Sequence, residues 1–235
     1  MAEHPAVGGG DQQAIWKYFQ NEGTHSFKEA EGRLRHLIGY LRRGQMVLNI
    51  GVGSGRLEEL ALAAGVNVHS LDPDAASIQR LRERLNLGER ARVGWGQSNP
   101  FLEASFDFVI ASEVLEHLSD ADLEGTVMEC ARVLKPGGKL MGTVPAREDL
   151  EESLVVCPEC EHRFHRWGHQ RSFTPDTLRA VLGKHLKVVR VVERPMIPWI
   201  NRNWQGKLAG CFKMLLYYLG IRVINSSLLF IAARP

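Results

Sequence analysis

Residues 47–55, with the sequence VLNIGVGSG, restrict the fold of this 235-residue chain more than any other segment. An apolar, strand-like run ends at Ile50, and glycines follow at alternate positions 51, 53 and 55. A good helix-forming segment then begins at Arg56. Glycine is favoured where φ must be positive or where a ligand approaches the main chain. The segment therefore predicts a strand, a tight turn and a helix, with either a nucleotide-like ligand over the turn or a plain βα connection.

A carboxylate at the end of the next predicted strand favours the ligand interpretation. Residues 66–71 are predicted to form a second short strand that ends at Asp72, about 20 residues beyond the glycines, where a doubly wound fold binds ribose hydroxyls. The alternative is that Asp72 caps the helix that starts near Ala75, but Asp74 is better placed for a cap. We therefore expect Asp72, with Pro73 beside it, to contact a ribose.

Two later motifs narrow the class of ligand. The glycines are spaced G-x-G-x-G, which is neither the dinucleotide pattern nor a phosphate loop. The run FDFVIASEVLEHL starts at Phe106, and VLKPGGKL starts at Val133. In this order, over roughly residues 45–145, the motifs resemble those of the class I S-adenosylmethionine (SAM) methyltransferases. The resemblance implies an enzyme that binds SAM.

The alternation of predicted strands and helices indicates an α/β fold with a parallel sheet. The resemblance implies a doubly wound, mostly parallel seven-stranded sheet of order 3-2-1-4-5-7-6, with strand 7 antiparallel. The predicted strands are 46–50, 66–71, 91–95, 106–111, 138–144, 186–192 and 227–234. The predicted domains are a disordered tail (1–10), N-terminal cap helices (11–44, as helices 11–22 and 27–42) and a methyltransferase domain (45–235) with insertions at about 150–172 and 194–222.

The resemblance also implies which residues hold the cofactor. The glycine loop would hold its methionine part, Asp72 its ribose, and Gln97 its adenine, unless Gln97 is only a solvated loop residue. Asn49 departs from the family pattern, because an acid usually stands there and an amide brings no charge to the cofactor's ammonium group. The expected cofactor residues are Asn49, Gly51, Val52, Gly53, Gly55, Asp72, Pro73, Gln97, Ser98 and Ser112.

Cysteines and histidines cluster in the first insertion. Cys157 and Cys160 are followed by His165 and His169, with His162 as a spare donor. Two cysteines at this spacing with nearby histidines suit tetrahedral Zn²⁺. The sequence therefore predicts a structural zinc bound by Cys157, Cys160, His165 and His169. The alternative is a pair of unmetallated thiols in a surface loop.

A second candidate metal motif is Glu113-x-x-Glu116-His117. On a helical turn these positions would share a face. The motif resembles the divalent-metal site of small-RNA 3′-end methyltransferases and of ubiquinone-pathway O-methyltransferases, and His169 is the matching later histidine. The resemblance implies that Glu113, Glu116, His117 and His169 are catalytic and that a metal there polarises an acceptor hydroxyl. The alternative is that these letters only shape a loop and start a helix.

The second insertion lies where the resembling family builds its acceptor pocket. Between Lys187 and Arg222 the chain carries seven basic residues and one acid, Glu193, and a helix is expected near 207–219. This segment could be a lid, a dimer surface or an interfacial helix that touches a membrane through 198–220. We favour an amphipathic helix packed on the domain.

Composition restricts the remaining function classes. The net charge of +2 gives no global field for nucleic acid, and no uncharged apolar run is long enough for a membrane span. We expect a soluble, cytoplasmic enzyme, without predicting its oligomeric state. It would transfer a methyl group from SAM to an oxygen, nitrogen or carbon of a small-molecule or glycan-like acceptor. The alternative is a degenerate methyltransferase core that binds nucleic acid through its Cys/His segment.

Overall fold

The computed structural model describes residues 15, 18, 30–195, 203–221 and 226–235. A seven-stranded sheet, ordered β3-β2-β1-β4-β5-β9-β8, forms the centre of the fold. All neighbouring pairs are parallel except β5–β9 and β9–β8. The strands are β1 (Met46–Ile50), β2 (Asn67–Asp72), β3 (Ala91–Val93), β4 (Phe106–Ser112), β5 (Leu134–Pro145), β8 (Lys187–Pro195) and β9 (Ser226–Ala233). The predicted order, including its antiparallel last strand, is confirmed.

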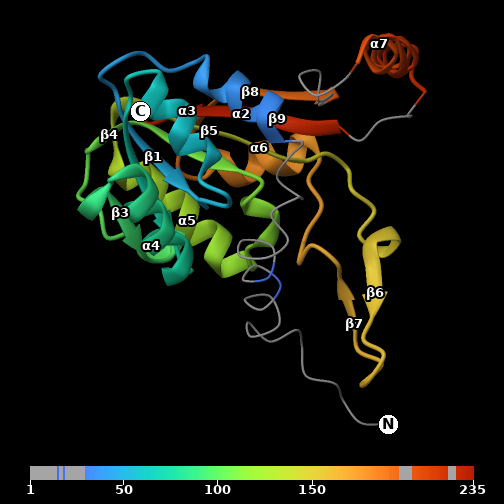
Figure 1. Cartoon of the computed structure of the whole chain (residues 1–235), viewed down its shortest axis with the longest axis horizontal. Coiled ribbons are helices and arrows are strands. Elements are labelled where there is room, and N and C mark those ends of the chain that lie inside the picture. The colour runs from blue at the N-terminus through green and yellow to red at the C-terminus, as the bar shows by residue number, and fades with distance from the viewer. Residues whose placement is uncertain (1–14, 16–17, 19–29, 196–202, 222–225) are drawn as a thin grey trace.

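Helices cover both faces of the sheet (Figure 1). Two buried apolar clusters lie on opposite faces: one includes side chains of α2, α3 and α4, and the other includes side chains of α5 and α6. Burial on both faces explains why β1 and β4 are apolar almost throughout rather than alternating. The helices are α2 (Glu31–Ile38), α3 (Arg56–Ala63), α4 (Ala75–Leu85), α5 (Asp120–Val133), α6 (Pro175–Gly183) and α7 (Trp204–Tyr218).

Local sequence signals set the starts of several helices. Asp74 caps α4 by accepting from the Ser77 amide, as its position predicted. Ser119 caps α5 in the same way. At the start of α6, Thr174 and Thr177 form a capping box, and Pro175 lies between them as the first residue of the helix. These caps fix where the helices begin relative to the strand ends that precede them.

Short 3₁₀ turns and a hairpin complete the described fold. The 3₁₀ turns are Gly88–Arg90, Gly96–Ser98, Leu115–His117 and Glu151–Ser153. Strands β6 (Leu154–Val156) and β7 (Arg163–His165) pair in an antiparallel hairpin that extends away from the sheet (Figure 1). The predicted tail 1–10 and nearly all of the predicted helix 11–22 lie outside the described residues, and the second predicted helix, 27–42, corresponds to the shorter α2. None of the helices in the described part of the chain has the length and hydropathy that a bilayer span requires.

Candidate active site

The glycine loop lies at the carboxyl edge of the sheet, tied to the end of β2. The Gly51 amide donates to the Leu71 carbonyl at 2.9 Å, and the Val52 amide donates to Asp72 Oδ2 at 2.9 Å. Asp72 Oδ1 accepts from the Asp74 amide. The buried Asp72 carboxylate therefore joins the loops after β1 and β2. This is the edge at which ligands bind in open α/β sheets.

Positive φ explains the three glycines of the loop. Gly51, Gly53 and Gly55 have φ values of 82°, 50° and 76°. A Cβ on Gly51 would also lie 2.7 Å from Val114 Cγ2, in the segment that follows β4. The loop thus leaves its backbone bare and packs closely against the neighbouring βα connection.

Asn49 points into the protein behind the loop, where it meets a buried acid. Its Nδ2 donates to the Gly51 carbonyl at 3.1 Å and to Glu58 Oε1 at 2.7 Å, and the Ser70 hydroxyl donates to the same oxygen at 2.8 Å. Burial raises the pKa of Glu58 to about 7, against its ordinary value of 4.5. The amide of Asn49 can therefore donate a hydrogen bond to Glu58, whereas an acid at position 49 would repel the Glu58 carboxylate.

Sequence reasoning missed Glu58, although a signal exists. It lies on the buried face of α3 between Leu57 and Ala61, where an unpartnered acid would be costly. The contact of Asn49 with the cofactor stays a prediction, and its observed contacts are with the loop and with Glu58.

Gln97 and Ser98 lie in the 3₁₀ turn after β3, which packs against α5. Gln97 Nε2 donates to Asp122 Oδ1 at 2.8 Å, so its side chain is directed to α5. Gln97 is therefore not merely a solvated loop residue. Its predicted contact with adenine stays a prediction.

Ser112 ends β4 beside a cation that sequence reasoning missed. Arg33, on α2, donates from Nε to Ser112 Oγ at 3.1 Å, and Ser112 Oγ lies 2.9 Å from Thr143 Oγ1. Arg33 Nη1 is also 3.8 Å from Glu113 Oε1. The helix before the sheet therefore contributes a guanidinium to the edge where the methionine part of the cofactor is expected. No local pattern distinguishes Arg33 from Arg35, the other arginine of α2.

The segments after β4 and β7 bring three of the four predicted catalytic residues together. One ligand atom each from Glu116, His117 and His169 lies within 4.8 Å of the others. The Gln170 amide donates to the Glu116 carbonyl at 2.8 Å, and Arg171 donates to the Leu118 carbonyl at 2.6 Å. These contacts to main-chain carbonyls hold the histidine segment across the turn Leu115–His117.

Glu113 stands apart from this group, which corrects the expectation that 113, 116 and 117 share one helical face. Its φ is 58°, and the 3₁₀ turn begins only at Leu115. The left-handed residue breaks the helical spacing. Glu113 therefore faces Arg33 instead of joining the other three.

The hydrogen bonds of two histidines fix their tautomers. His117 Nδ1 lies 3.2 Å from the Gly168 carbonyl, which only accepts, so Nδ1 carries the proton. His169 Nδ1 lies 2.5 Å from Glu148 Oε2, just after β5. Because this carboxylate oxygen accepts the hydrogen bond, His169 donates from Nδ1. In the neutral form of each ring the lone pair is then on Nε2, the arrangement that metal-binding histidines adopt.

Glu116 is the electrostatic centre of the group. Its side chain is fully buried, and among the described residues neither of its carboxylate oxygens has a hydrogen-bond partner. Burial, and then the negative charge of Glu113, raise the pKa of Glu116, while Arg33 opposes this rise. Burial lowers the pKa of His117 to about 3, so this ring stays neutral. A buried carboxylate without donors beside two imidazoles, of which His117 is neutral, fits a divalent cation.

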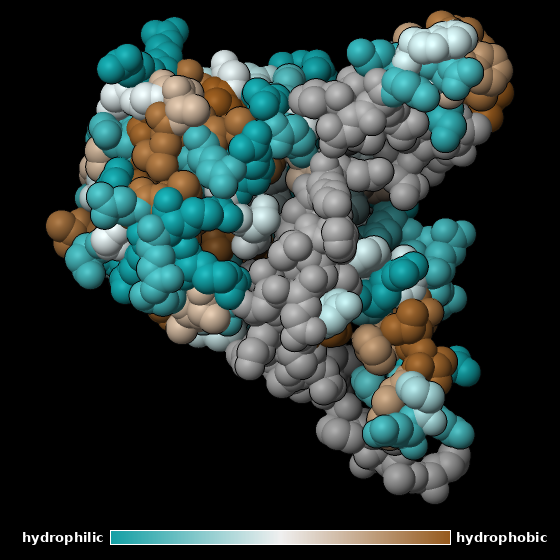
Figure 2. Space-filling model, in the orientation of Figure 1, coloured by the Kyte–Doolittle hydropathy of each residue, from teal (hydrophilic) through white to brown (hydrophobic). Residues whose placement is uncertain are grey.

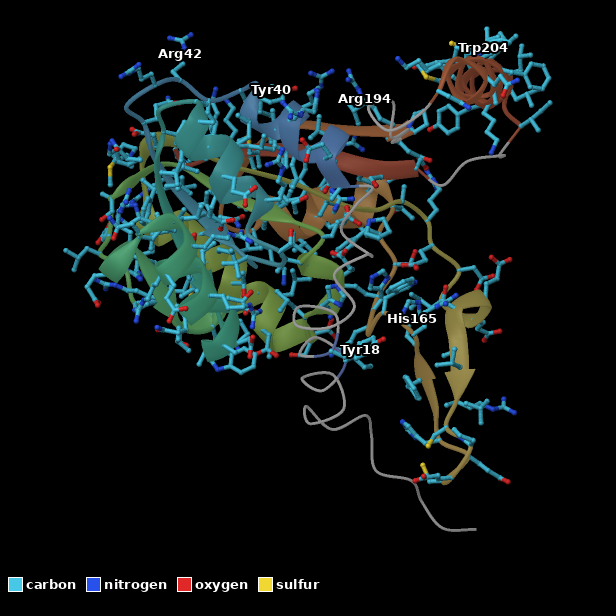
Figure 3. The ribbon with its side chains drawn as sticks, in the orientation of Figure 1. Tyr18, Tyr40, Arg42, His165, Arg194 and Trp204 are labelled. Carbon is cyan, nitrogen blue, oxygen red and sulfur yellow. The ribbon has the colours of Figure 1, made fainter. Side chains whose placement is uncertain are left out.

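The predicted zinc site of Cys157, Cys160, His165 and His169 is not formed. Among the described residues, potential ligands gather in only two groups, Glu116 with His117 and His169, and Glu148 with His165 and His169. Leu154 pairs with His165 across the hairpin, whereas the cysteines follow Val156 at its tip. Figure 3 shows His165 at the end of the hairpin nearest the sheet. Antiparallel pairing thus separates residues that are close in sequence.

His165 supports the group formed by Glu116, His117 and His169 and is not itself a ligand of that group. Its Nδ1 accepts from the His169 amide at 3.1 Å and from the Trp167 amide at 3.3 Å. In the neutral ring the proton is therefore on Nε2, which lies 3.6 Å from Glu148 Oε1. A protonated Nε2 cannot bind a metal, so the group with Glu116 is the better candidate.

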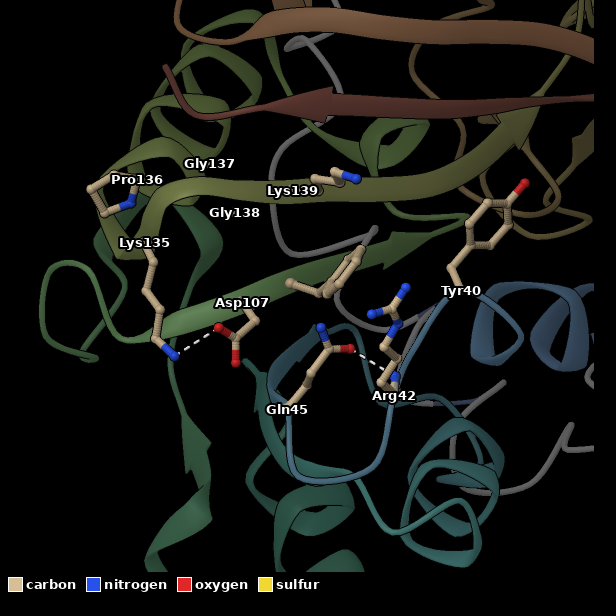
Figure 4. Close-up of a pocket in the computed structure, with 10 residues that line it drawn as sticks. Tyr40, Arg42, Gln45, Asp107, Lys135, Pro136, Gly137, Gly138 and Lys139 are labelled. Carbon is tan, nitrogen blue, oxygen red and sulfur yellow. Dashed lines mark hydrogen bonds and ion pairs between the residues drawn. The ribbon is translucent and has the colours of Figure 1, made fainter.

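A cavity of about 320 Å³ lies at the opposite, amino-terminal edge of the sheet (Figure 4). Its lining includes Arg42, Asp107 and Lys135, and Lys135 Nζ pairs with Asp107 Oδ1 at 2.7 Å. The Asp107 carboxylate also accepts from the Met46 amide at the start of β1. These contacts hold strand starts together, away from the edge where the glycine loop and Glu116 lie.

Comparisons with known proteins agree with this geometry. Residues 48–142 match a family model described as a methyltransferase domain. A methyltransferase of uncharacterised specificity from Geobacillus thermodenitrificans is 30% identical over 68% of this chain and 76% of its own length. The human mitochondrial ubiquinone biosynthesis O-methyltransferase is 30% identical over 63% of this chain and 42% of its own.

A similar fold is found in a solved structure of the complex between the Haloferax volcanii Trm112 methyltransferase activator and a methyltransferase. The matching chain is 20% identical to this chain, with a TM-score of 0.67, and the match covers 94% of this chain and 97% of the other. The sheet order, the glycine loop and these relatives agree. The chain belongs to the class I SAM-dependent methyltransferases and is an enzyme of that class.

Proposed function

We propose that the protein methylates a hydroxyl oxygen of a small-molecule or glycan-like acceptor, with a divalent metal held by Glu116, His117 and His169. The observation that carries the proposal is the convergence of these three ligand atoms within 4.8 Å. When bound, such a metal acts as a Lewis acid that lowers the pKa of a coordinated hydroxyl. Oxygen is favoured over nitrogen because a hydroxyl must lose its proton to become a good nucleophile.

The residues of the cluster have separate tasks in this proposal. Glu116 supplies charge, and the two histidines supply Nε2 lone pairs. Glu148 holds His169 in the required tautomer from outside the ligand set. Glu113, next to Ser112 at the end of β4, is the candidate acceptor for the hydroxyl proton. Methyl transfer also needs the nucleophile in line at about 3 Å from the methyl carbon in a site that excludes water.

Cofactor binding is assigned to the loop after β1 and to its neighbours. In this proposal the bare backbone of the glycine loop receives the methionine part, Asp72 the ribose and Gln97 or Ser98 the adenine. Arg33 and Ser112 would receive the methionine carboxylate, because a guanidinium and a hydroxyl converge at 3.1 Å there. The relative named as a ubiquinone O-methyltransferase supports oxygen as the methylated atom.

Metal binding tests the proposal without an identified acceptor. Metal-free protein is titrated with Co²⁺, and the visible absorption of the bound ion is recorded together with the heat of binding. We expect one site per chain, lost in His117→Ala and in His169→Ala. His36→Ala, which changes an exposed histidine on α2, is the matched control and should bind normally. Equal binding by all four proteins would refute the ligand assignment.

Activity is tested separately with methyl-labelled SAM and catechol as a probe acceptor. We expect transfer to the catechol oxygen that falls on chelation and returns when Mn²⁺ or Co²⁺ is restored. Transfer that chelation leaves unchanged would exclude a metal role. The nucleic-acid alternative receives no support from the relatives, which are named as methyltransferases.

A further inference from the structure

Helix α7 exposes an apolar face that no other described element covers. Large apolar side chains at positions 204, 208, 212, 215 and 218–219 are spaced by three or four residues, which places them on one side of the helix and its C-terminal end. Each of them is more than half exposed. This exposed apolar face consists of Trp204, Leu208, Phe212, Leu215, Tyr218 and Leu219.

The opposite side of α7 faces the protein. Gly210 is buried, and Met214 and Tyr217 are half-buried. Hydrogen bonds to Ser226 and Glu193 act on the Tyr217 hydroxyl, at the adjoining ends of β9 and β8. The helix is therefore oriented, and its exposed apolar face points outward. This differs from our expectation that the apolar side chains pack on the domain.

The position of α7 makes this face accessible. The helix stands beyond the ends of β8 and β9 at a corner of the molecule, with Trp204 on it (Figures 1 and 3). Apolar residues gather along its outer margin in the space-filling view (Figure 2). Because β5 and β8 are both antiparallel to β9, they run in the same direction. The helix thus leaves the sheet at the edge where the glycine loop and Glu116 lie.

The charged residues around α7 indicate which kind of surface could cover its exposed apolar face. The helix has no acidic residue, and Lys207 and Lys213 are exposed. In 187–222, Glu193 is the one acid against seven bases, and it already pairs with Arg147 at 3.2 Å. A second copy of α7 would bring lysines without acidic partners. An anionic bilayer offers both apolar depth and negative charge.

We propose that α7 docks this protein on the surface of an anionic phospholipid bilayer, with the exposed apolar face in the headgroup region. Trp204 and Tyr218, near the two ends of the helix, carry the amphipathic rings that settle at membrane interfaces. Lys207, beside this face, places its ammonium group with the lipid phosphates, and Lys213 adds positive charge from the far side of the helix. Docking leaves the fold intact and brings the carboxyl edge of the sheet near the bilayer.

Vesicle flotation of the full-length protein tests this inference. The vesicles contain either phosphatidylcholine alone or phosphatidylcholine mixed with phosphatidylglycerol. We expect binding to the mixed vesicles that weakens with salt, and binding to phosphatidylcholine that is weaker by roughly tenfold. Leu208→Glu/Phe212→Glu should lower binding by roughly tenfold or more, because two buried side chains are lost. Lys207→Gln/Lys213→Gln should remove most of the salt dependence.

The matched control is Leu102→Glu, which adds a charge at an exposed leucine on the loop before β4. It should bind vesicles as the unchanged protein does, and all variants should melt alike and bind SAM equally. The proposal is overturned if the protein does not float with mixed vesicles or if Leu208→Glu/Phe212→Glu floats as well as the control. It is also overturned if light scattering shows a dimer that Leu208→Glu/Phe212→Glu dissociates without any vesicle binding. None of these outcomes depends on the metal or the acceptor.

Discussion

Replacement of Glu58 by glutamine should stabilise the protein above neutral pH and leave it almost unchanged in acid. The folded protein holds this carboxyl at a pKa of about 7, against 4.5 for the ordinary group. Between these values the folded state binds more protons than the unfolded state, so stability falls as the pH rises. A difference of about 2.5 units corresponds to about 3 kcal/mol, fully expressed above pH 7.

Glutamine reproduces the protonated acid at this position. Its carbonyl can accept from Asn49 Nδ2 and from the Ser70 hydroxyl, as Glu58 Oε1 does. Urea unfolding of both proteins at about pH 5 and about pH 8 measures the free energy of unfolding. The variant should match the parent protein within about 1 kcal/mol in acid and exceed it by about 3 kcal/mol in base.

Glu59→Gln is the matched control, one residue away on α3. Glu59 forms partly exposed ion pairs with Arg56 at 2.7 Å and Arg84 at 3.2 Å, so its loss should cost less than about 1 kcal/mol. A Glu58→Gln protein that is no more stable than its parent at about pH 8 would refute the argument that the buried carboxyl is ionised at a cost.

Three further predictions concern the loop and the cluster. Gly51→Ala should lower the melting temperature and SAM affinity, because Gly51 has a positive φ and a Cβ there would meet Val114. Gly137→Ala is the control for strain alone, because Gly137 has a φ of 75° and a Cβ there would meet nothing within 4 Å. Equal losses of melting temperature in the two variants would exclude a role for the Val114 contact. Glu148→Gln should weaken Co²⁺ binding by about 10- to 100-fold without unfolding the protein, because His169 loses its charged partner. Unchanged Co²⁺ affinity would remove Glu148 from its positioning role. Arg33→Gln should weaken S-adenosylhomocysteine binding in calorimetry by roughly tenfold, because a charge-assisted hydrogen bond is lost, and unchanged affinity would exclude the proposed carboxylate contact.

The sheet was predictable from the sequence because its signals are local and ordered. Recognisable turn sequences mark strand boundaries, such as the glycines that follow Ile50 and the Lys-Pro-Gly-Gly segment in the first part of β5. The grouping of Glu116 and His117 with His169 was likewise predictable, since the family resemblance supplied the partner. The hydrogen bond between Asp72 and the glycine loop was predictable as well, because β1 and β2 are parallel neighbours that end at the same edge of the sheet.

The remaining features depend on tertiary packing, which residue spacing does not describe. Glu148, Glu58 and Arg33 act through side-chain contacts that join different elements of the fold. The cysteines were misassigned because counting along the chain ignores the pairing of β6 with β7. The helical face expected for Glu113, Glu116 and His117 was wrong, because the left-handed Glu113 precedes the 3₁₀ turn that starts at Leu115. The exposed apolar face of α7 could not be predicted from spacing, because spacing does not say which side of a helix packs on the rest of the protein.

A crystal structure with S-adenosylhomocysteine and Mn²⁺, using anomalous scattering to locate the metal, separates methyl transfer with a bound metal from transfer without one. We expect the product in the glycine loop and one anomalous peak bound by Glu116, His117 and His169. A peak at Cys157 and Cys160, or no peak beside Glu116 with the product in place, would contradict the proposed metal-assisted methyl transfer.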